Sequence, residues 1–402
     1  MQPCSGLPFE KRTSGASMTQ TIDILVLGGG PAGSAAAKRA ADLGLSVAII
    51  DKAVFPRDKL CGGMLSGRSI RALEALFAGQ SSVPKALVSR DILFRWAGAE
   101  VAEFQAPHDL TLTMRYDFDA ELQRHAVENG AKTFYGARDI ALDPDKNQIR
   151  ADGQILNYRV LIGADGANSQ VARTLFGRAM NPKTIGFGLE VEVPHASLNM
   201  APHVQIDFRA VNWGYGWVFP KSGGWTIGVG GLLSRNPDMK SRMADYLTSV
   251  GVDPGSAKVK GHHLPFGDYR KIPGRKNVLL AGDAAGLVDP LTGEGIAYAL
   301  ESGALAVEAA KTALDLGKPE HAIRHYRKAL QPQFSELANA VFLRRLAFLP
   351  RLEGLFRDRL THSERLRTAF FNLLDGQESY DSLKRQARSK TLAALPTGFW
   401  RR

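Results

Sequence analysis

The feature that most constrains this chain is a glycine-rich turn between a short apolar strand and an alanine-rich helix. Residues 22–27 read Ile-Asp-Ile-Leu-Val-Leu, a run typical of a buried parallel strand. Gly28, Gly30 and Gly33 follow at the G-x-G-x-x-G spacing, and residues 34–43 are predicted to be a helix. This spacing permits a tight turn, close approach of backbone N–H groups to a pyrophosphate, and close packing of helix on strand. The sequence therefore predicts a doubly wound, Rossmann-like α/β domain that binds a dinucleotide.

A second predicted strand ends in an acidic residue. Residues 46–50 are Ser-Val-Ala-Ile-Ile, and Asp51 follows them. An acid about 20 positions after the glycines is suited to accept hydrogen bonds from the ribose hydroxyls of a dinucleotide. The alternative is a glycine-rich turn in an unrelated α/β fold, but strand, glycines, helix, strand and acid in this order favour the dinucleotide site.

A strand near residue 280 favours FAD over NAD. Residues 277–281 form an apolar run that leads into Gly282 and Asp283, and a helix is predicted from Ile296. The Asp283 carboxylate is placed to accept hydrogen bonds from a ribityl chain, which NAD lacks. The N-terminus of the following helix would stabilise negative charge on a reduced flavin. The alternative interpretation is that Asp283 only caps a turn.

Four further stretches carry a family resemblance. Residues 160–169 contain the pair Asp165-Gly166, which resembles the Asp-Gly motif of the p-hydroxybenzoate hydroxylase superfamily, where it lies near FAD and the nicotinamide donor. Residues 55–63 (FPRDKLCGG), 115–119 (RYDFD) and 215–220 (YGWVFP) together resemble the geranylgeranyl reductase family. This resemblance spans about residues 22–314. It implies an FAD-dependent enzyme that saturates isoprenoid double bonds in chlorophyll, quinone or archaeal lipid precursors.

The same resemblance implies roles for single residues. Cys61 would lie close to the substrate double bond as the catalytic candidate, and Arg115 would contact FAD. Tyr215, Trp217 and Phe219 would form the wall of the substrate cavity, although Asn212 stands where the family motif begins with proline. The residues themselves also allow plainer interpretations. Cys61 suits a small buried hydrophobe beside the cofactor, and the aromatic residues suit a core cluster.

The predicted cofactor site combines the glycine turns, the strand-end acids and the loop around Cys61. Its members are Gly28, Gly30, Pro31, Ala32, Gly33, Asp51, Lys52, Cys61, Gly62, Gly63, Arg115, Asp165, Gly282, Asp283, Pro290, Gly293, Gly295 and Ile296. No second G-x-G-x-x-G unit is present, so the reductant is expected to be NADPH or NADH bound transiently, or a protein donor. The histidines match no metal-site spacing, and no metal is predicted.

Charge and composition suggest where the protein works. The net charge is +11, of which residues 321–402 carry +9, so the basic character gives no reason to expect a nucleic-acid partner. No uncharged apolar run of about 18 residues and no secretory signal stand out, and two cysteines fit a reducing, cytoplasmic compartment. From residue 341 to 374, apolar residues recur at helical spacing among arginines, with a break expected at Pro350. This basic amphipathic segment either contacts a membrane surface or packs its apolar stripe on the protein.

The predicted organisation has four parts. Residues 1–21 form a flexible tail, and residues 317–402 form a C-terminal helical region. The FAD-binding domain comprises 22–88, 131–169 and 274–316, and an inserted antiparallel substrate domain comprises 89–130 and 170–273. The favoured function is hydride transfer from reduced FAD to an isoprenoid C=C bond. The alternatives are an aromatic monooxygenase or halogenase, and a non-catalytic or electron-relaying, membrane-associated flavoprotein.

Overall fold

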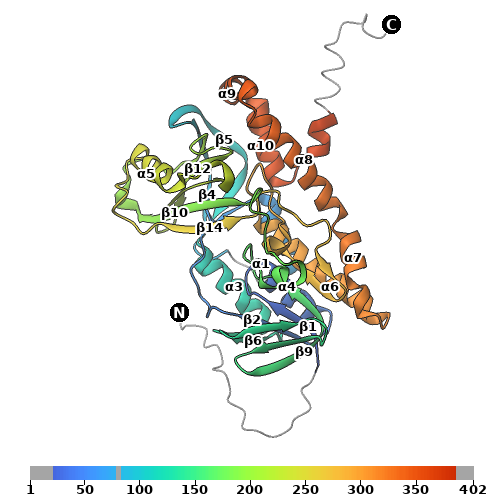
Figure 1. Cartoon of the computed structure of the whole chain (residues 1–402). Coiled ribbons are helices and arrows are strands. Elements are labelled where there is room, and N and C mark those ends of the chain that lie inside the picture. Colours follow the sequence, from blue (N-terminus) through green and yellow to red (C-terminus); the bar gives the residue numbers. More distant parts are fainter. Residues whose placement is uncertain (1–20, 78–82, 386–402) are drawn as a thin grey trace, which may run out of the picture.

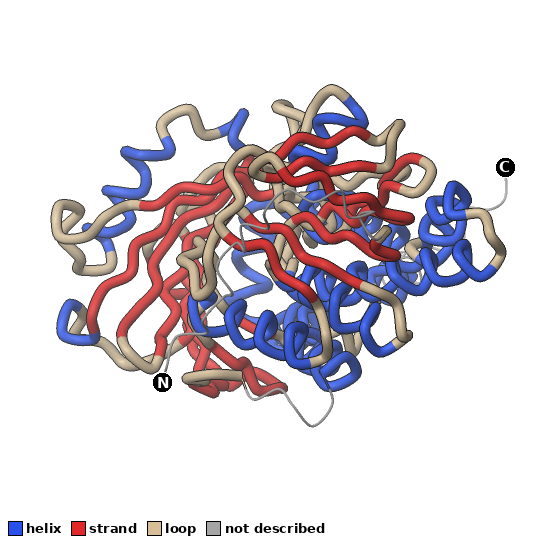
Figure 2. Tube along the Cα trace, turned by 90° about the horizontal axis from the view of Figure 1, so that it is seen from below, coloured by secondary structure: helices blue, strands red, loops and turns tan. Residues whose placement is uncertain are grey.

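The computed structural model describes residues 21–77 and 83–385, so the predicted flexible tail lies almost entirely outside the described residues. The strands form two eight-stranded sheets, one mostly parallel and one mostly antiparallel (Figures 1 and 2). The C-terminal helices run along one side of both domains: the first two pack beside the parallel sheet, and the last two pack on the antiparallel sheet (Figure 1). The predicted class, a Rossmann-like domain with an inserted β-sheet and C-terminal helices, is confirmed.

The mostly parallel sheet, called sheet A, is built around the first strand of the chain. Its order is β15-β16-β9-β1-β2-β6, and β7 and β8 extend it from β9. The strands are β1 (Ile22–Leu27), β2 (Val47–Asp51), β6 (Lys132–Tyr135), β7 (Ile140–Asp143), β8 (Gln148–Ala151), β9 (Gln154–Gly163), β15 (Gly274–Arg275) and β16 (Val278–Leu280). Strands β1, β9 and β16 run parallel, so the motifs that follow them meet at the same edge of the sheet.

Helices α1 (Pro31–Asp42) and α6 (Ile296–Asp315) pack directly against each other, and their closest approach is at a glycine of α6. A Cβ on Gly303 of α6 would lie 2.2 Å from the carbonyl oxygen of Ala32 on α1. Helix α3 (Arg115–Glu128) also packs on α1, and its Ala126 belongs to the core of sheet A. The sequence-based division grouped α3 with the substrate domain, but its packing joins it to the FAD-binding side.

The second sheet, called sheet B, has the order β14-β10-β13-β12-β11-β4-β5-β3. Its strands are β3 (Met64–Leu65), β4 (Leu87–Trp96), β5 (Ala99–Leu112), β10 (Gly186–Pro194), β11 (Val204–Phe208), β12 (Gly214–Lys221), β13 (Gly224–Leu232) and β14 (Lys260–Leu264). All neighbours are antiparallel except β4 and β11, which pair in parallel. Helix α5 (Met239–Ser249) covers one face through Met243, Tyr246 and Leu247.

The C-terminal region is a series of helices broken at Pro350, as the sequence predicts. Helices α7 (Ala322–Ala329) and α8 (Gln331–Ala347) precede the break, and α9 (Glu353–His362) and α10 (Glu364–Asp375) follow it. Phe370 and Phe371 of α10 pack on aromatic residues of sheet B, including Phe94 and Phe208. Among the described helices, none is long and apolar enough to cross a membrane.

Candidate functional site

A cavity of about 820 Å³ lies where the strand ends of sheet A face sheet B. Its volume falls within the roughly 300–1,000 Å³ typical of ligand and cofactor sites. Most of the predicted site residues line it. These are Gly28, Gly30, Pro31, Ala32, Asp51, Lys52, Cys61, Gly62, Gly63, Arg115, Asp165, Asp283, Gly293, Gly295, Ile296, Tyr215, Trp217 and Phe219. Residues from widely separated parts of the chain therefore meet around one cavity.

One end of the cavity is formed by the turn between β1 and α1. Gly28 has a φ of +106°, and a Cβ there would lie 2.3 Å from the carbonyl oxygen of Ala164, so only glycine fits. Gly30 faces open space, since an added Cβ would meet only the Arg57 guanidinium, at 3.5 Å. The Asp51 carboxylate accepts the Gly29 N–H at 2.6 Å and stays at the cavity wall. This end offers backbone N–H groups, a helix N-terminus and a carboxylate.

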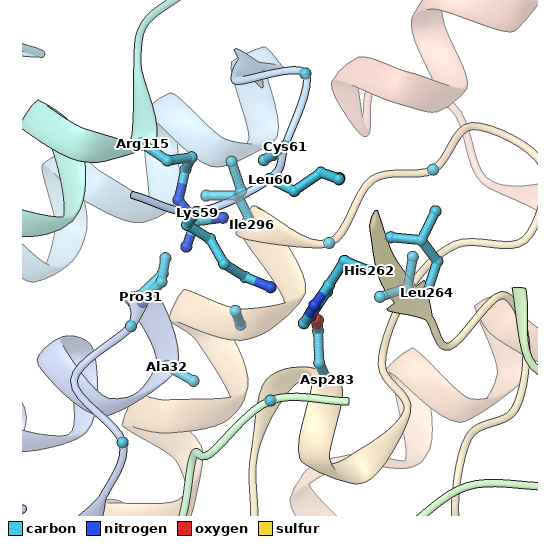
Figure 3. Close-up of a pocket in the computed structure, with 18 of the residues that line it drawn as sticks. Pro31, Ala32, Lys59, Leu60, Cys61, Arg115, His262, Leu264, Asp283 and Ile296 are labelled. Carbon is cyan, nitrogen blue, oxygen red and sulfur yellow. The ribbon is translucent and has the colours of Figure 1, made fainter. Parts of the chain in front are cut away.

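The centre of the cavity holds a group of ionisable side chains. Lys59, Arg115, His262 and Asp283 all line it, and Figure 3 shows them around the same space. Burial lowers the pKa of Lys59 to about 8, with Arg115 and Arg57 adding repulsion, and it lowers the pKa of His262 to about 3. Burial also raises the pKa of Asp283, against the attraction of Lys59 and Arg115. Within the described part of the chain, the Asp283 carboxylate accepts no hydrogen bond.

Helix α6 begins beside this group, and a glutamate holds its first turn. The Glu294 carboxylate accepts the Ala297 N–H at 2.9 Å and the Ser66 hydroxyl at 2.5 Å. Burial raises the pKa of Glu294. Gly295 and Ile296 line the cavity, so the N-terminus of α6 faces it, as predicted.

The arrangement fits FAD. The Nη1 atom of Arg57 and the Nε2 atom of His262 are buried without a hydrogen-bond partner among the described residues. Both residues line the cavity, as does the Asp283 carboxylate. Buried polar atoms are normally paired, so these unpaired atoms are suited to the phosphates, hydroxyls and ring edges of a polar cofactor. No cluster of His, Cys, Asp and Glu in the described part of the chain is arranged to hold a metal ion.

The loop around Cys61 separates this polar region from an apolar arm of the cavity. The Cys61 thiol accepts the Gly63 N–H at 3.3 Å, and the Cys61 N–H donates to Glu190 at 3.1 Å. Gly62 lies against the Phe219 ring, where an added Cβ would come within 2.8 Å of a ring carbon. The arm itself is lined by Ile206, Phe208, Tyr215, Trp217, Phe219, Phe370 and Leu374.

Three predicted cofactor residues do not line the cavity. A Cβ on Gly33 would lie 1.8 Å from the carbonyl oxygen of Gly28, so this glycine serves the packing of α1 on the turn. Gly282 has a φ of +57° and packs near Ala32, and Pro290 packs near Gly267. Asp165 lines the cavity, but its carboxylate accepts the backbone N–H groups of Gln170 and Val171 at the start of α4 (Gln170–Phe176). Its geometry is that of a helix cap.

The sequence-based assignment also missed residues at the site. Glu190, Lys221 and His262 are single polar residues on strands of sheet B, and no motif marks them. Phe370 and Leu374 were recognised as one apolar face of a helix, but the surface that this face covers was left open. Lys59 lies within the stretch 55–63, but no role was predicted for it.

This fold and site define an FAD-dependent oxidoreductase. The family model described as FAD dependent oxidoreductase matches residues 23–132. The menaquinone reductase of Mycobacterium tuberculosis is 35% identical over 317 residues, covering 73% of this chain and 77% of that protein. The geranylgeranyl diphosphate reductase of Rhodobacter capsulatus is 31% identical over 402 residues, covering 94% and 95%. A geranylgeranyl bacteriochlorophyll reductase-like protein from Thermoplasma acidophilum superposes with a TM-score of 0.75 at 20% identity, covering 92% and 99%. The chain belongs to the geranylgeranyl reductase family.

Proposed function

We propose that this protein uses FAD to reduce C=C bonds of an isoprenoid chain. The observation that carries the proposal is that the aromatic side chains of the arm line the same cavity as the cofactor residues, with Phe219 and Trp217 against Gly62. Bound FAD, once reduced, supplies the hydride. The chain's own residues bind the cofactor, hold the prenyl chain against it and exclude water.

The arm suits a prenyl chain because its walls are apolar on two sides. Sheet B contributes Phe208 and Trp217, and α10 contributes Phe370 and Leu374. The side chains of Phe208, Trp217 and Leu374 are at most 6% exposed, so a chain bound among them would be shielded from water. A flexible prenyl chain matches such a surface, because burying apolar area is its main source of binding free energy.

Cys61 is the proposed residue at the reacting centre. It lines the cavity between the cofactor residues and the aromatic arm, and the Arg115 guanidinium lies near enough to attract its side chain electrostatically. Asp119 holds that guanidinium with two contacts of 2.6 and 2.7 Å, which fixes its orientation toward the cavity. In this proposal Cys61 contacts the carbons of the double bond, and Arg115 fixes the position of the thiol.

The reductant is proposed to be NADPH or NADH bound transiently, or a protein donor. In the described part of the chain, the only other glycine-rich run resembling a dinucleotide turn is Gly228–Gly231. It lies within strand β13 of the antiparallel sheet and is followed by no strand-to-helix turn. A donor would therefore reach the flavin from the open side of the cavity.

We also propose that the protein works at a membrane surface, where prenyl substrates gather. Five large apolar side chains between residues 342 and 355 are exposed, and arginines lie among them. They are Phe342, Leu346, Leu349, Leu352 and Leu355. An apolar patch ringed by basic residues suits the interface of a bilayer that contains anionic lipid.

Rapid-mixing kinetics test the main proposal. The FAD-loaded protein is reduced without oxygen and mixed with geranylgeranyl diphosphate, with menaquinone, or with oxygen. Fast reoxidation by geranylgeranyl diphosphate, or by menaquinone with two hydrogens gained in its prenyl chain and not in its quinone ring, supports the reductase if reaction with oxygen is slow. Cys61→Ala should slow the prenyl reaction while retaining FAD. Fast reaction with oxygen through a flavin–oxygen adduct, with both prenyl compounds inert, would move the protein to the monooxygenase or halogenase class.

A further inference from the structure

Two buried charged side chains lie beneath the Cys61–Gly63 loop, and the proposed reaction assigns them no role. Glu190 on β10 is 1% exposed, and Lys221 on β12 is 2% exposed. The Lys221 ammonium donates a hydrogen bond to the carbonyl oxygen of Gly62. Burying ionisable groups costs free energy, so a buried pair of this kind needs an explanation.

Glu190 connects the two parts of the cavity. One oxygen of its carboxylate accepts the Cys61 N–H at 3.1 Å, and the other accepts the indole N–H of Trp217 at 3.2 Å. Thus a single carboxylate joins the loop on the cofactor side to the aromatic wall on the substrate side.

A glycine on the strand between them makes this connection possible. Gly228 of β13 lies directly opposite Glu190 of β10 and directly opposite Trp217 of β12. A Cβ on Gly228 would lie 2.3 Å from the Trp217 ring. Only a residue without a side chain lets the indole lie across β13 and reach the carboxylate.

We propose that Glu190 is a positioning residue whose ionised carboxylate fixes the Cys61–Gly63 loop and the Trp217 side chain relative to each other. We call these two contacts the clamp. Each oxygen of the carboxylate accepts a hydrogen bond from an N–H group, and these N–H groups can only donate. Protonating the carboxyl turns one oxygen into a hydroxyl, which donates and is a much poorer acceptor, so one of the two contacts is then weakened. The role of the arm in binding substrate rests on the proposed function, whereas the clamp consists of contacts within the chain.

The charges around Glu190 place this change near neutral pH. Burial raises the pKa of Glu190 to about 7, opposed by the Cys61 N–H, by the Lys221 ammonium and by the Trp217 indole, while Glu192 on the same strand raises it further. Strand β13 contributes only Gly228 at this level, and β14 places Lys260 directly opposite Glu190, with its ammonium paired to Glu192 and Asp58. Burial lowers the pKa of Lys221 to about 8. The Glu190 carboxylate and the Lys221 ammonium are therefore charged together between about pH 7 and pH 8.

Indole NMR tests the clamp without any catalytic assay. The FAD-loaded full-length protein is labelled with ¹⁵N-tryptophan, its five indole signals are followed from pH 5 to 9, and Trp217→Phe identifies the signal of Trp217. We expect that signal to shift with a midpoint near 7, and to lose the transition in Glu190→Gln, in which the amide can accept only one of the two N–H groups. Glu192→Gln, on the same strand with an exposed side chain, should keep the transition. A Trp217 signal that stays constant in the wild-type protein overturns the proposal, and this measurement needs no variant at Glu190.

Steady-state kinetics separate this inference from the proposed function. Glu190→Gln should raise the KM for the prenyl substrate roughly tenfold and remove the acid limb of kcat/KM, while the FAD content is retained. If the indole titrates but no prenyl compound is reduced, the clamp stands and the proposed function fails. If prenyl reduction is fast while the indole signal does not titrate, the function stands and the clamp is wrong.

Discussion

At the scale of single residues, Asp283 marks a ligand site because its buried carboxylate has no hydrogen-bond donor among the described residues. Its carboxylate faces the cavity beside Lys59 and accepts no hydrogen bond from the described residues. A carboxylate in such a place destabilises the empty protein and is compensated when a ligand brings hydroxyl groups to it. Stability and function therefore oppose each other at this residue.

Replacing Asp283 with alanine should weaken FAD binding. A hydrogen bond to a charged group contributes about 1.5–3 kcal/mol, which corresponds to roughly a 10- to 150-fold rise in Kd. The Kd is measured by the quenching of FAD fluorescence on titration of the apoprotein. Asp315→Ala, at the exposed C-terminal end of α6 and away from the cavity, should bind FAD as the wild-type protein does. An unchanged Kd in Asp283→Ala would show that the carboxylate does not contact the cofactor.

At the scale of elements, the contact between α1 and α6 sets the distance between two helix N-termini that line the cavity. Gly303 allows this contact, because a Cβ there would lie 2.2 Å from the carbonyl oxygen of Ala32. In most helices, replacing glycine with alanine stabilises the fold by up to about 1 kcal/mol. We expect Gly303→Ala to do the opposite, to lower the free energy of unfolding by about 1–3 kcal/mol and to weaken FAD binding.

The chain offers a matched control for this change. Gly354 lies in α9 with open space around its Cα, so Gly354→Ala should keep or slightly raise the melting temperature. The melting temperatures of the two variants are compared by thermal unfolding, monitored by circular dichroism. If Gly303→Ala melted as high as Gly354→Ala, the close packing of α1 on α6 would not limit stability.

The elements that could be predicted from sequence are those defined by local spacing. The turn at Gly28, the helix at Ile296 and the break at Pro350 each follow from neighbouring residues, and the structure has all three. Glu190 could not be recognised, because its environment depends on the pairing of β10 with β13 and of β13 with β12. The apolar face of α10 could be predicted from its residue spacing. The surface on which it packs could not, because that surface depends on the direction of the chain after Pro350.

At the scale of the whole molecule, one part of the C-terminal region packs its apolar residues on the protein, and another part leaves apolar residues exposed. Leu360 and Phe371 are buried against sheet B, and Phe370 and Leu374 close the substrate arm. The segment just before them, residues 342–355, leaves five large apolar side chains exposed. The helices that line the arm are therefore continuous in sequence with the proposed membrane-contacting surface, and in the proposed function a prenyl chain would pass between the two.

This arrangement predicts binding to anionic vesicles through residues 342–355. The double variant Leu352→Glu/Leu355→Glu removes two exposed leucines and adds negative charge, and it should lower vesicle binding at least tenfold, since each buried leucine contributes about 1.5–3 kcal/mol. Cosedimentation with phosphatidylcholine vesicles containing phosphatidylserine measures the effect, and added salt should weaken binding through the arginines. Ile155→Glu, on β9 at the opposite end of the molecule (Figure 1), replaces an equally exposed apolar residue and should bind as the wild-type protein does. Equal binding by the double variant would mean that this surface meets no membrane and that the substrate enters the arm elsewhere.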